Sequence, residues 1–262
     1  MQPIEARLTQ NFIKALADAA IGSGGRVEHF PGVTCVRSPI PVTPFNSAFV
    51  IERAGVEPDS LNKIRGFFDG LQSDWRFVFP PAIAEVFWDI PKHLAVARWG
   101  RDPEMILSSQ SASLRPTPSE LEIHPVRDVD ELLTWTRTNS LGFEAPDPNF
   151  FDALARPENL EMKGLTWYIG TYSGKPVATS TLCISDAVAG IYDVCTLPEF
   201  RGRGFGSAMT AIAMKEGFSK GCDLAALQSS PVGVPVYFKM GFRYVFDYLC
   251  WVVSHRTHGS KN

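Results

Sequence analysis

The residues best suited to chemistry form a glycine-rich turn, Arg201–Gly206, with the sequence Arg-Gly-Arg-Gly-Phe-Gly. A predicted strand precedes this turn, and a predicted helix of about Phe205–Lys220 follows it. Alternating glycines let the backbone adopt left-handed conformations and let a ligand come close. Because the first N–H groups of a helix are unpaired and carry partial positive charge, the turn predicts an anion site that suits a pyrophosphate. Arg201 and Arg203 would add charge-assisted donors.

Two other phosphate-binding turns do not fit this segment. A Walker A turn needs a lysine after its last glycine, whereas Ser207 follows Gly206. A Rossmann turn needs Gly-x-Gly-x-x-Gly, but the third glycine counted from Gly202 would fall on Ser207. The pattern that remains is Arg-x-x-Gly-x-Gly after a strand.

The elements that must position this turn alternate between helix and strand. Asp128 is a suitable cap for the first helix, and Gly221 is a suitable end for the helix after the turn. In chain order the pattern predicts helices at 128–140 and 149–155, strands at 167–172, 177–184 and 189–196, the helix after the turn, a strand at 224–228, a short helix at 235–240 and a strand at 244–253. This order indicates an α/β domain with a mixed sheet.

At this point the sequence resembles the GNAT superfamily, the Gcn5-related N-acetyltransferases. Arg201–Gly206 matches the central Q/R-x-x-G-x-G/A motif of that family, and Leu197–Phe200 matches the usual approach to it. Tyr237–Phe242 (Tyr-Phe-Lys-Met-Gly-Phe) is similar to the tyrosine and Gly-Phe bend that come later in the family. The resemblance covers about Glu122–Val253. It implies a GNAT-type α/β (α+β) fold, a mixed and largely antiparallel sheet flanked by helices.

The resemblance also implies roles in binding acetyl-CoA as co-substrate. Backbone groups of the strand before the turn would bond the pantetheine arm like an added strand, and N–H groups of the turn would hold the pyrophosphate. Ser230 stands where many members carry an asparagine that faces the cofactor. The implied cofactor-binding residues are Val194, Cys195, Thr196, Arg201, Gly202, Arg203, Gly204, Phe205, Gly206, Ser207 and Ser230. No metal is implied.

The family chemistry is direct attack of an amine on the thioester, through an oxyanion that a backbone N–H stabilises. Tyr237 would protonate the leaving thiolate. The amine needs a base, which some members supply as a glutamate on the third strand, but that position here is Gly190. Asp193 on the same strand is one replacement, Glu144 after the first helix is another, and deprotonation through water is a third. The choice among the three stays open.

The chain divides at a polar segment rich in serine and proline. We expect an N-terminal α/β domain over 1–107, a linker over 108–119, the acetyltransferase domain over 120–254 and a flexible tail over 255–262. The N-terminal pattern predicts a helix that begins near Ile4 and is ended by Gly22–Gly25, a strand at 47–52, a helix at 59–71 and a strand at 75–79. Pro91–Leu107 echoes the end of the C-terminal domain, because a short helix leads into Trp99-Gly100 and an apolar strand. The first domain is therefore either a degenerate GNAT repeat without the phosphate motif or an unrelated cap.

Composition narrows the partners. A net charge of −3 over 262 residues gives no sign of nucleic-acid binding, and no apolar run approaches the roughly 20 residues of a membrane helix. Five scattered cysteines without a signal peptide fit reduced thiols in the cytoplasm. The expected function is transfer of an acetyl or small acyl group to a primary amine of a small molecule or peptide, by a monomer or homodimer. The alternative is a catalytically silent acyl-CoA sensor or partner-binding protein.

The acceptor groove is expected between the two parts of the chain. Aromatic residues such as Trp75, Trp88, Trp99 and Phe143 would suit an acceptor with apolar character.

Overall fold

The computed structural model describes residues 3–112 and 117–255, so 113–116 of the expected linker and 256–262 of the expected tail lie outside the described residues. The helices are α1 (Ile4–Gly22), α2 (Pro58–Phe68), α3 (Ile90–His93), α4 (Val129–Gly142), α5 (Pro157–Leu160), α6 (Phe205–Ser219) and α7 (Val234–Lys239). The strands are β1 (Arg26–Phe30), β2 (Val33–Arg37), β3 (Ser47–Val50), β4 (Trp75–Phe79), β5 (Arg98–Ser108), β6 (Leu121–Pro125), β7 (Leu165–Tyr172), β8 (Lys175–Ser185), β9 (Val188–Thr196), β10 (Leu224–Gln228) and β11 (Arg243–Val253). We call 3–112 the N-terminal half and 117–255 the C-terminal half.

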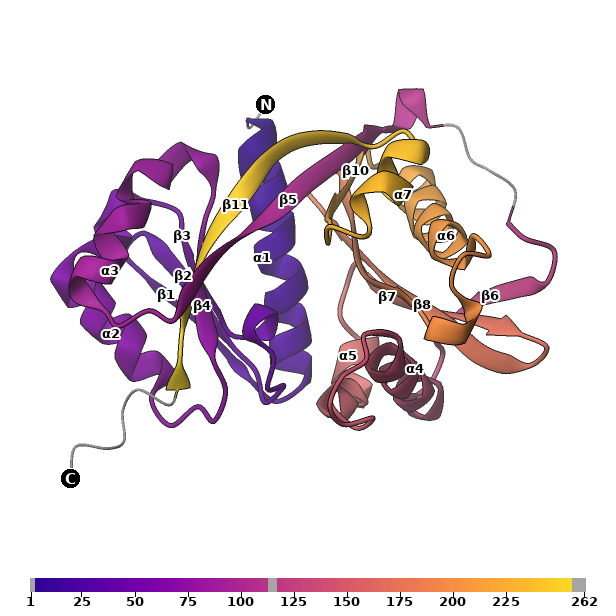
Figure 1. The fold of residues 1–262 in the computed structure, drawn as a ribbon, viewed down its shortest axis with the longest axis horizontal. Coiled ribbons are helices and arrows are strands. Elements are labelled where there is room, and N and C mark those ends of the chain that lie inside the picture. The colour runs from indigo at the N-terminus through magenta and orange to yellow at the C-terminus, as the bar shows by residue number, and fades with distance from the viewer. Residues whose placement is uncertain (1–2, 113–116, 256–262) are drawn as a thin grey trace.

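All these strands form one sheet, in the order β1-β2-β3-β4-β11-β5-β10-β9-β8-β7-β6. Most neighbours are antiparallel, and the pairs β3–β4 and β9–β10 are parallel. Helices lie on both sides of the sheet (Figure 1). The expected mixed, largely antiparallel sheet flanked by helices is confirmed.

The two halves repeat one topology and exchange one strand each. In each half, antiparallel strands lead to a parallel pair, and a short helical segment then leads into a long strand. That long strand is β5 in the N-terminal half and β11 in the C-terminal half. β11 pairs with β4, and β5 pairs with β10, so each long strand lies inside the other half's part of the sheet (Figure 1). The echo at Pro91–Leu107 thus corresponds to a shared arrangement, while the domain boundaries stay a prediction.

Helix α1 packs along the middle of the sheet and joins the halves. Its apolar positions Leu8, Phe12 and Leu16 fall at a four-residue spacing and are all buried. From the same helix, Asn11 Nδ2 donates to the carbonyls of Cys183 and Val188 on β8 and β9, at 3.0 and 3.2 Å. A helix of the N-terminal half is therefore fixed against the C-terminal sheet by buried hydrogen bonds.

Helix α4 begins as the sequence predicts. Asp128 Oδ1 accepts from the N–H of Glu131 at 2.8 Å. Glu131 Oε2 in turn accepts from the N–H of Arg127, the residue before the cap, an arrangement close to a capping box. At its inner face Trp135 is fully buried and packs edge-on against Trp167, with ring centroids 4.7 Å apart. This packing holds the end of α4 beside β8 and β9, next to the site described below.

No helix among the described residues is both long enough and apolar enough to cross a membrane.

Candidate functional site

Strands β9 and β10 run side by side only at their beginnings. Their parallel pairing ends at Gly190 and Ala226. Beyond that point β10 continues along β5, while β9 continues along β8. The two strands therefore part, and the edge of β9 that faced β10 becomes available to an extended ligand that can add to it like a strand.

Strand β9 carries a bulge just past this split. Asp193 and Val194 together lie opposite Ser180, and Asp193 has a left-handed φ of 53°. The Asp193 carbonyl accepts from the Thr179 hydroxyl at 2.8 Å and from Asn139 Nδ2 at 3.3 Å. These bonds hold a conformation that costs a non-glycine residue about 1–3 kcal/mol, and the bulge re-aims the strand into the split.

The glycine-rich turn follows β9 and opens directly into α6. Gly202 and Gly204 have φ of 80° and 82°, where only glycine is unstrained, and a side chain added at Gly202 would meet open space. Phe205 anchors the start of the helix, because its ring is buried against Tyr172 at a centroid distance of 6.0 Å. No acidic residue lies in the first turn of α6. The turn is thus an open, positively polarised cradle.

The two arginines of the turn lie in different surroundings. Arg201 donates to the carbonyls of Thr196 and Gly142, at 3.2 and 2.8 Å, and pairs with Glu144 at 3.1 Å. It therefore holds the end of β9 and the loop after α4 in place. The Arg203 guanidinium lies over the ring of Phe200 at 5.3 Å and over the ring of Tyr172.

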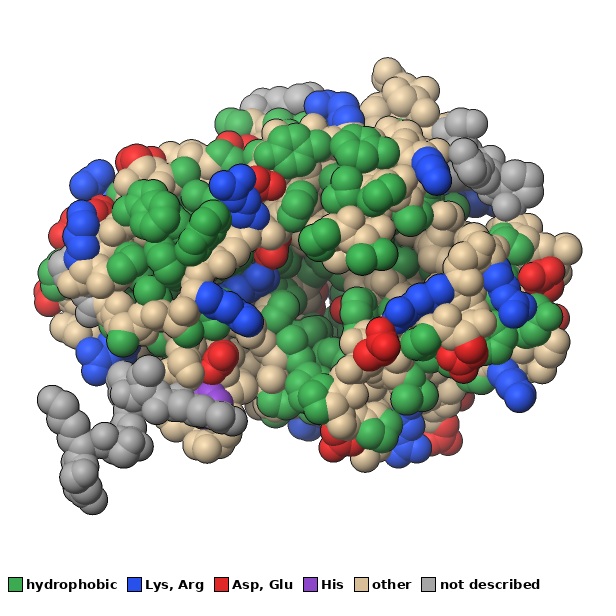
Figure 2. Space-filling model, in the orientation of Figure 1, with side chains coloured by type: hydrophobic (Ala, Val, Ile, Leu, Met, Phe, Trp, Pro, Cys, Tyr) green, Lys and Arg blue, Asp and Glu red, His purple; other side chains and the backbone are tan. Residues whose placement is uncertain are grey.

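A cleft of about 450 Å³ lies between the halves, beside the split. Four of the predicted site residues line it, namely Asp193, Val194, Ser230 and Tyr237. Val194 also lies near the turn, because its Cγ1 is 4.0 Å from the place of a side chain at Gly206. The cleft and the cradle thus meet along the end of β9. Figure 2 shows the cleft as a hollow near the centre of the molecule, surrounded by hydrophobic side chains.

Two hydroxyl-bearing residues of the cleft, Ser230 and Tyr237, belong to the turn before α7 and to α7 itself. Ser230 Oγ accepts from the N–H of Gly233 at 3.2 Å, so this side chain supports the start of α7. The Tyr237 ring packs edge-on against Phe242 with centroids 5.7 Å apart. Burial raises the pKa of the Tyr237 phenol. The phenol therefore keeps its proton at neutral pH and can donate it.

Asp193 supplies the acidic side chain of the bulge in β9. Its Oδ2 accepts from the Thr181 hydroxyl at 3.0 Å, and burial raises its pKa to about 6. At pH 7 it is mostly ionised and only weakly solvated, which suits a general base. Glu144 lies elsewhere, exposed on the surface and paired with Arg201, and does not line the cleft.

The place of the family's glutamate is filled from α1. A side chain added at Gly190 would come within 1.9 Å of Asn11 Oδ1 and 2.7 Å of the Tyr192 ring. Asn11 Oδ1 accepts from the Tyr192 hydroxyl at 2.8 Å, so the two occupy this space together. A side chain at Gly190 would have to displace Asn11 and Tyr192, so the third strand has no ready space for that glutamate.

Several cleft residues escaped the sequence analysis. One wall is α1 with Phe12, and further polar groups are Arg76, Asp102 and Gln228. In the sequence, these three polar residues were marked only by their positions at the edges of apolar strands. Of the four aromatic residues expected in the groove, only Phe143 lines it. Trp75 is buried in the N-terminal core, and Trp88 and Trp99 are exposed elsewhere, so the expectation for these three was wrong.

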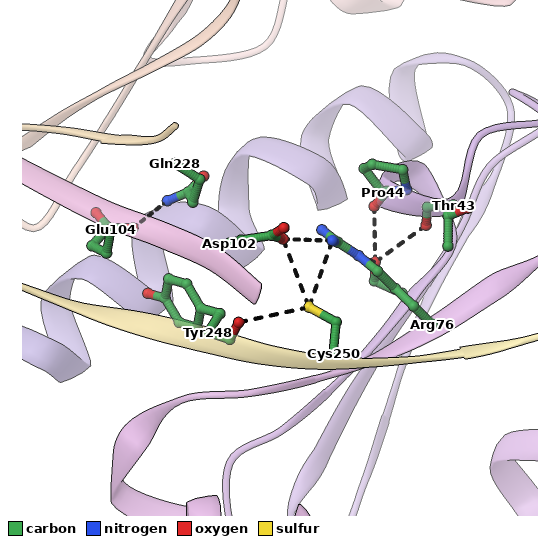
Figure 3. Close-up of polar contacts among 9 residues, drawn as sticks. Thr43, Pro44, Arg76, Asp102, Glu104, Gln228, Tyr248 and Cys250 are labelled. Carbon is green, nitrogen blue, oxygen red and sulfur yellow. Dashed lines mark hydrogen bonds and ion pairs between the residues drawn. The ribbon is translucent and has the colours of Figure 1, made fainter. Parts of the chain in front are cut away.

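The cations of the cleft are already paired. Arg76, which lines the cleft, bonds Asp102 at 2.5 Å (Figure 3). It also donates to the hydroxyl of Ser47 at 3.1 Å. Arg101 lies 3.5 Å from Asp247. Among the residues that the structure describes, no three His, Cys, Asp or Glu side chains lie close enough together to hold a metal ion.

Comparison with known proteins gives a family match for this part of the chain. Residues 127–242 match the family described as the acetyltransferase (GNAT) family. The resemblance drawn from the motif is therefore confirmed over these residues. A curated relative, glucosamine 6-phosphate N-acetyltransferase of Trypanosoma brucei brucei, is 36% identical over 78 residues. The match covers 27% of this chain and 53% of the relative, so the chain spans about half of that protein.

The fold of both halves has counterparts in solved structures. A GCN5-related N-acetyltransferase from Kribbella flavida superposes with a TM-score of 0.68 and 19% identity, covering 98% of each chain. A tandem GNAT protein from the clavulanic acid biosynthesis pathway gives a TM-score of 0.59 at 10% identity, over 88% of this chain and 79% of that one. At these identities the likeness shows the fold alone, and the tandem neighbour is consistent with the repeated topology of the two halves.

Proposed function

We propose that this protein is an N-acyltransferase that moves an acetyl or small acyl group from acyl-CoA to the primary amine of a small apolar molecule. One observation carries this proposal. The open cradle at the start of α6, the bulged edge of β9 and the Tyr237 side chain all border the place where β9 and β10 part.

The donor half of the reaction uses backbone groups. The N–H groups of Gly202–Ser207 would bind the pyrophosphate of CoA, and residues Val194–Thr196 would bond the pantetheine arm along the free edge of β9. The thioester would then lie at the bulge. A backbone N–H there would stabilise the oxyanion that forms when the amine attacks.

The proton steps would use two side chains with opposite tasks. Asp193, ionised above about pH 6, would take a proton from the acceptor ammonium before attack, or from the amine nitrogen as it attacks the thioester. Tyr237, whose pKa is raised by burial, would give its proton to the departing thiolate of CoA. The new amide bond forms as the thioester C–S bond breaks.

The walls of the cleft favour an apolar acceptor. Phe12, Phe45, Trp167 and Phe143 line it, and both of its arginines are engaged by aspartates. A sugar phosphate, the acceptor in the name of the trypanosomal relative, would need cations that are free to bind a dianion. We therefore propose an amine with an aromatic or aliphatic body.

One observation keeps the silent acyl-CoA sensor as a second candidate. The family's glutamate has no ready space at Gly190, so catalysis depends on Asp193 or on water. A sensor would bind acetyl-CoA and release no CoA with any amine.

A CoA-release screen distinguishes the two candidates. Wild-type protein is mixed with acetyl-CoA and, in turn, phenethylamine, octylamine, phenylalanine, a short peptide, spermidine and glucosamine 6-phosphate. The proposal predicts that phenethylamine or octylamine gives the fastest thiol release. Acetyl-CoA binding without thiol release from any amine would instead favour the sensor.

A further inference from the structure

A fully buried carboxyl group lies behind the cleft, on the strand exchanged between the halves. Glu104 of β5 is 0% exposed and lies between Gln228 on β10 and Phe246 on β11. Its Oε2 accepts from Gln228 Nε2, whereas its Oε1 has no hydrogen-bond partner in the described part of the chain. A buried, half-satisfied acid costs stability, so its position calls for a role.

Its partner Gln228 connects this acid to the cleft. Gln228 lines the cleft at the last position of β10, two residues beyond the end of the β9–β10 pairing. Figure 3 shows its amide directed at Glu104 across the two strands. Because Nε2 is bound to Glu104, the Oε1 end of the amide is left for the cleft.

This geometry suits the recognition of an amine. A nucleophilic amine keeps its lone pair for the thioester and gives its N–H groups to acceptors, and an amide oxygen is such an acceptor. We propose that Gln228 Oε1 orients the acceptor amine at the split between β9 and β10, and that Glu104 is a positioning residue that fixes which end of the Gln228 amide faces the cleft. This inference rests on the proposed function, because it takes the cleft as the acceptor site.

The surroundings of Glu104 make this arrangement sensitive to pH. Burial, with a further contribution from the Asp102 charge, raises its pKa to about 8. The other titratable groups that face Glu104 are Tyr248 on β11 and Tyr192 on β9. Two residues of α1, Thr9 and Asn11, form hydrogen bonds with Tyr248 and Tyr192, respectively. Both tyrosines stay neutral, because burial holds the pKa of each well above its usual range. Glu104 is therefore the group of this layer that titrates near pH 8, and its ionised form binds Nε2–H more strongly.

The first test needs no acceptor. The side-chain N–H signals of Gln228 in ¹⁵N-labelled protein are assigned by their loss in Gln228→Met and followed from pH 6 to 9.5. We expect a shift with a midpoint near pH 8 in wild type and a flat profile in Glu104→Gln, which has the size of the protonated acid. A flat profile in folded wild type would overturn the coupling, whatever the fate of the variant.

The second test uses phenethylamine as the probe amine. Gln228→Met should raise the KM for phenethylamine about tenfold, the value of one hydrogen bond, with kcat and acetyl-CoA affinity nearly unchanged. Gln72→Met, at an exposed glutamine away from the cleft, is the matched control and should change nothing. An unchanged KM in Gln228→Met would overturn the role of the amide.

The positioning role has its own readout. The ratio of KM values between Glu104→Gln and wild type should be near 1 below pH 7 and should rise several-fold by pH 9. This ratio cancels the ionisation of phenethylamine itself. A ratio of KM values that does not change with pH would show that Glu104 has only a structural role and does not position Gln228. Calorimetry with acetyl-CoA on the same samples tests the proposed function separately, because donor binding does not involve Gln228.

Discussion

The start of α6 in the C-terminal half and the start of α2 in the N-terminal half occupy the same place in one repeated topology, yet they differ in charge and space. α6 begins at Gly204 without an acidic residue in its first turn, whereas α2 begins after Glu57 and carries Asp59 in its first turn. Acids at a helix start offset the partial positive charge there and repel a phosphate. The start of α6 is therefore open to an anion, and the start of α2 is closed to one.

The strands that precede α6 and α2, β9 and β3, also differ in how regularly they pair. β9 has a bulge at Asp193, but β3 pairs with β2 and β4 without any shift of register. The loop after β3 is also packed tight, since a side chain added at Gly55 would come within 2.3 Å of Val33. The N-terminal half thus keeps the shared fold and fills the places where the C-terminal half keeps its site.

The N-terminal half nevertheless contributes to the cleft. It supplies α1 as one wall and β5 as a strand inside the C-terminal part of the sheet. The comparison teaches that a half without an open helix start can still supply a wall and a strand to the cleft of the other half.

The largest expected effect comes from making α6 resemble α2. Gly204→Glu places an acid at the helix start, so acetyl-CoA affinity should fall at least ~100-fold, since charge repulsion adds to strain in a left-handed residue. Calorimetry measures this, with circular dichroism as the check on folding. Gly204→Ala is the control that carries the strain without the charge and should lose much less. Glu57→Ala, at the closed counterpart, should leave the affinity unchanged.

The second-largest effect is expected when the Asp193 carboxyl group is removed from the bulge of β9. Strand β3 has no such bulge. With Asp193 as base, kcat/KM should fall as the pH drops through about 6, because the carboxyl is then protonated. Asp193→Asn should lower kcat/KM about 100-fold at pH 7.5 and abolish this acidic limb. Asp186→Asn, at another left-handed aspartate outside the cleft, is the matched control. An acidic limb that persists in Asp193→Asn would assign the base elsewhere.

A smaller effect is expected when α7 is made to resemble its counterpart in the N-terminal half, the 3-10 helix η3 (Pro81–Asp89). There Phe87 packs on Trp251 and has no hydroxyl to donate. Tyr237→Phe should lower kcat about 10- to 100-fold and leave acetyl-CoA affinity within about twofold, because the ring still packs on Phe242. Tyr244→Phe, at an exposed tyrosine of β11, should match wild type. Equal turnover in Tyr237→Phe would remove this phenol from the mechanism.

Local patterns predicted much of the C-terminal half, including the elements on either side of the glycine-rich turn. The strand at 224–228 has the predicted bounds, and the turn at Arg201–Gly206 connects β9 to α6 as expected. These features depend on short-range signals, namely apolar runs, glycines and helix caps. Strand β4, at 75–79 in the N-terminal half, was predicted for the same reason.

The acceptor side depends on contacts that no local pattern contains. The place of a side chain at Gly190 is filled by Asn11, far away in the sequence, and Gln228 meets Glu104 only because β5 crosses into the other half. The short strands β1, β2 and β6 were also missed, since five residues with mixed polarity give little periodicity.

Calorimetric titration with acetyl-CoA tests the central claim most directly, because it counts sites as well as measuring affinity. The difference between the two helix starts predicts one site per wild-type chain and no measurable site in folded Gly204→Glu. Two sites per wild-type chain, or undiminished binding by Gly204→Glu, would contradict the assignment of the anion site to α6.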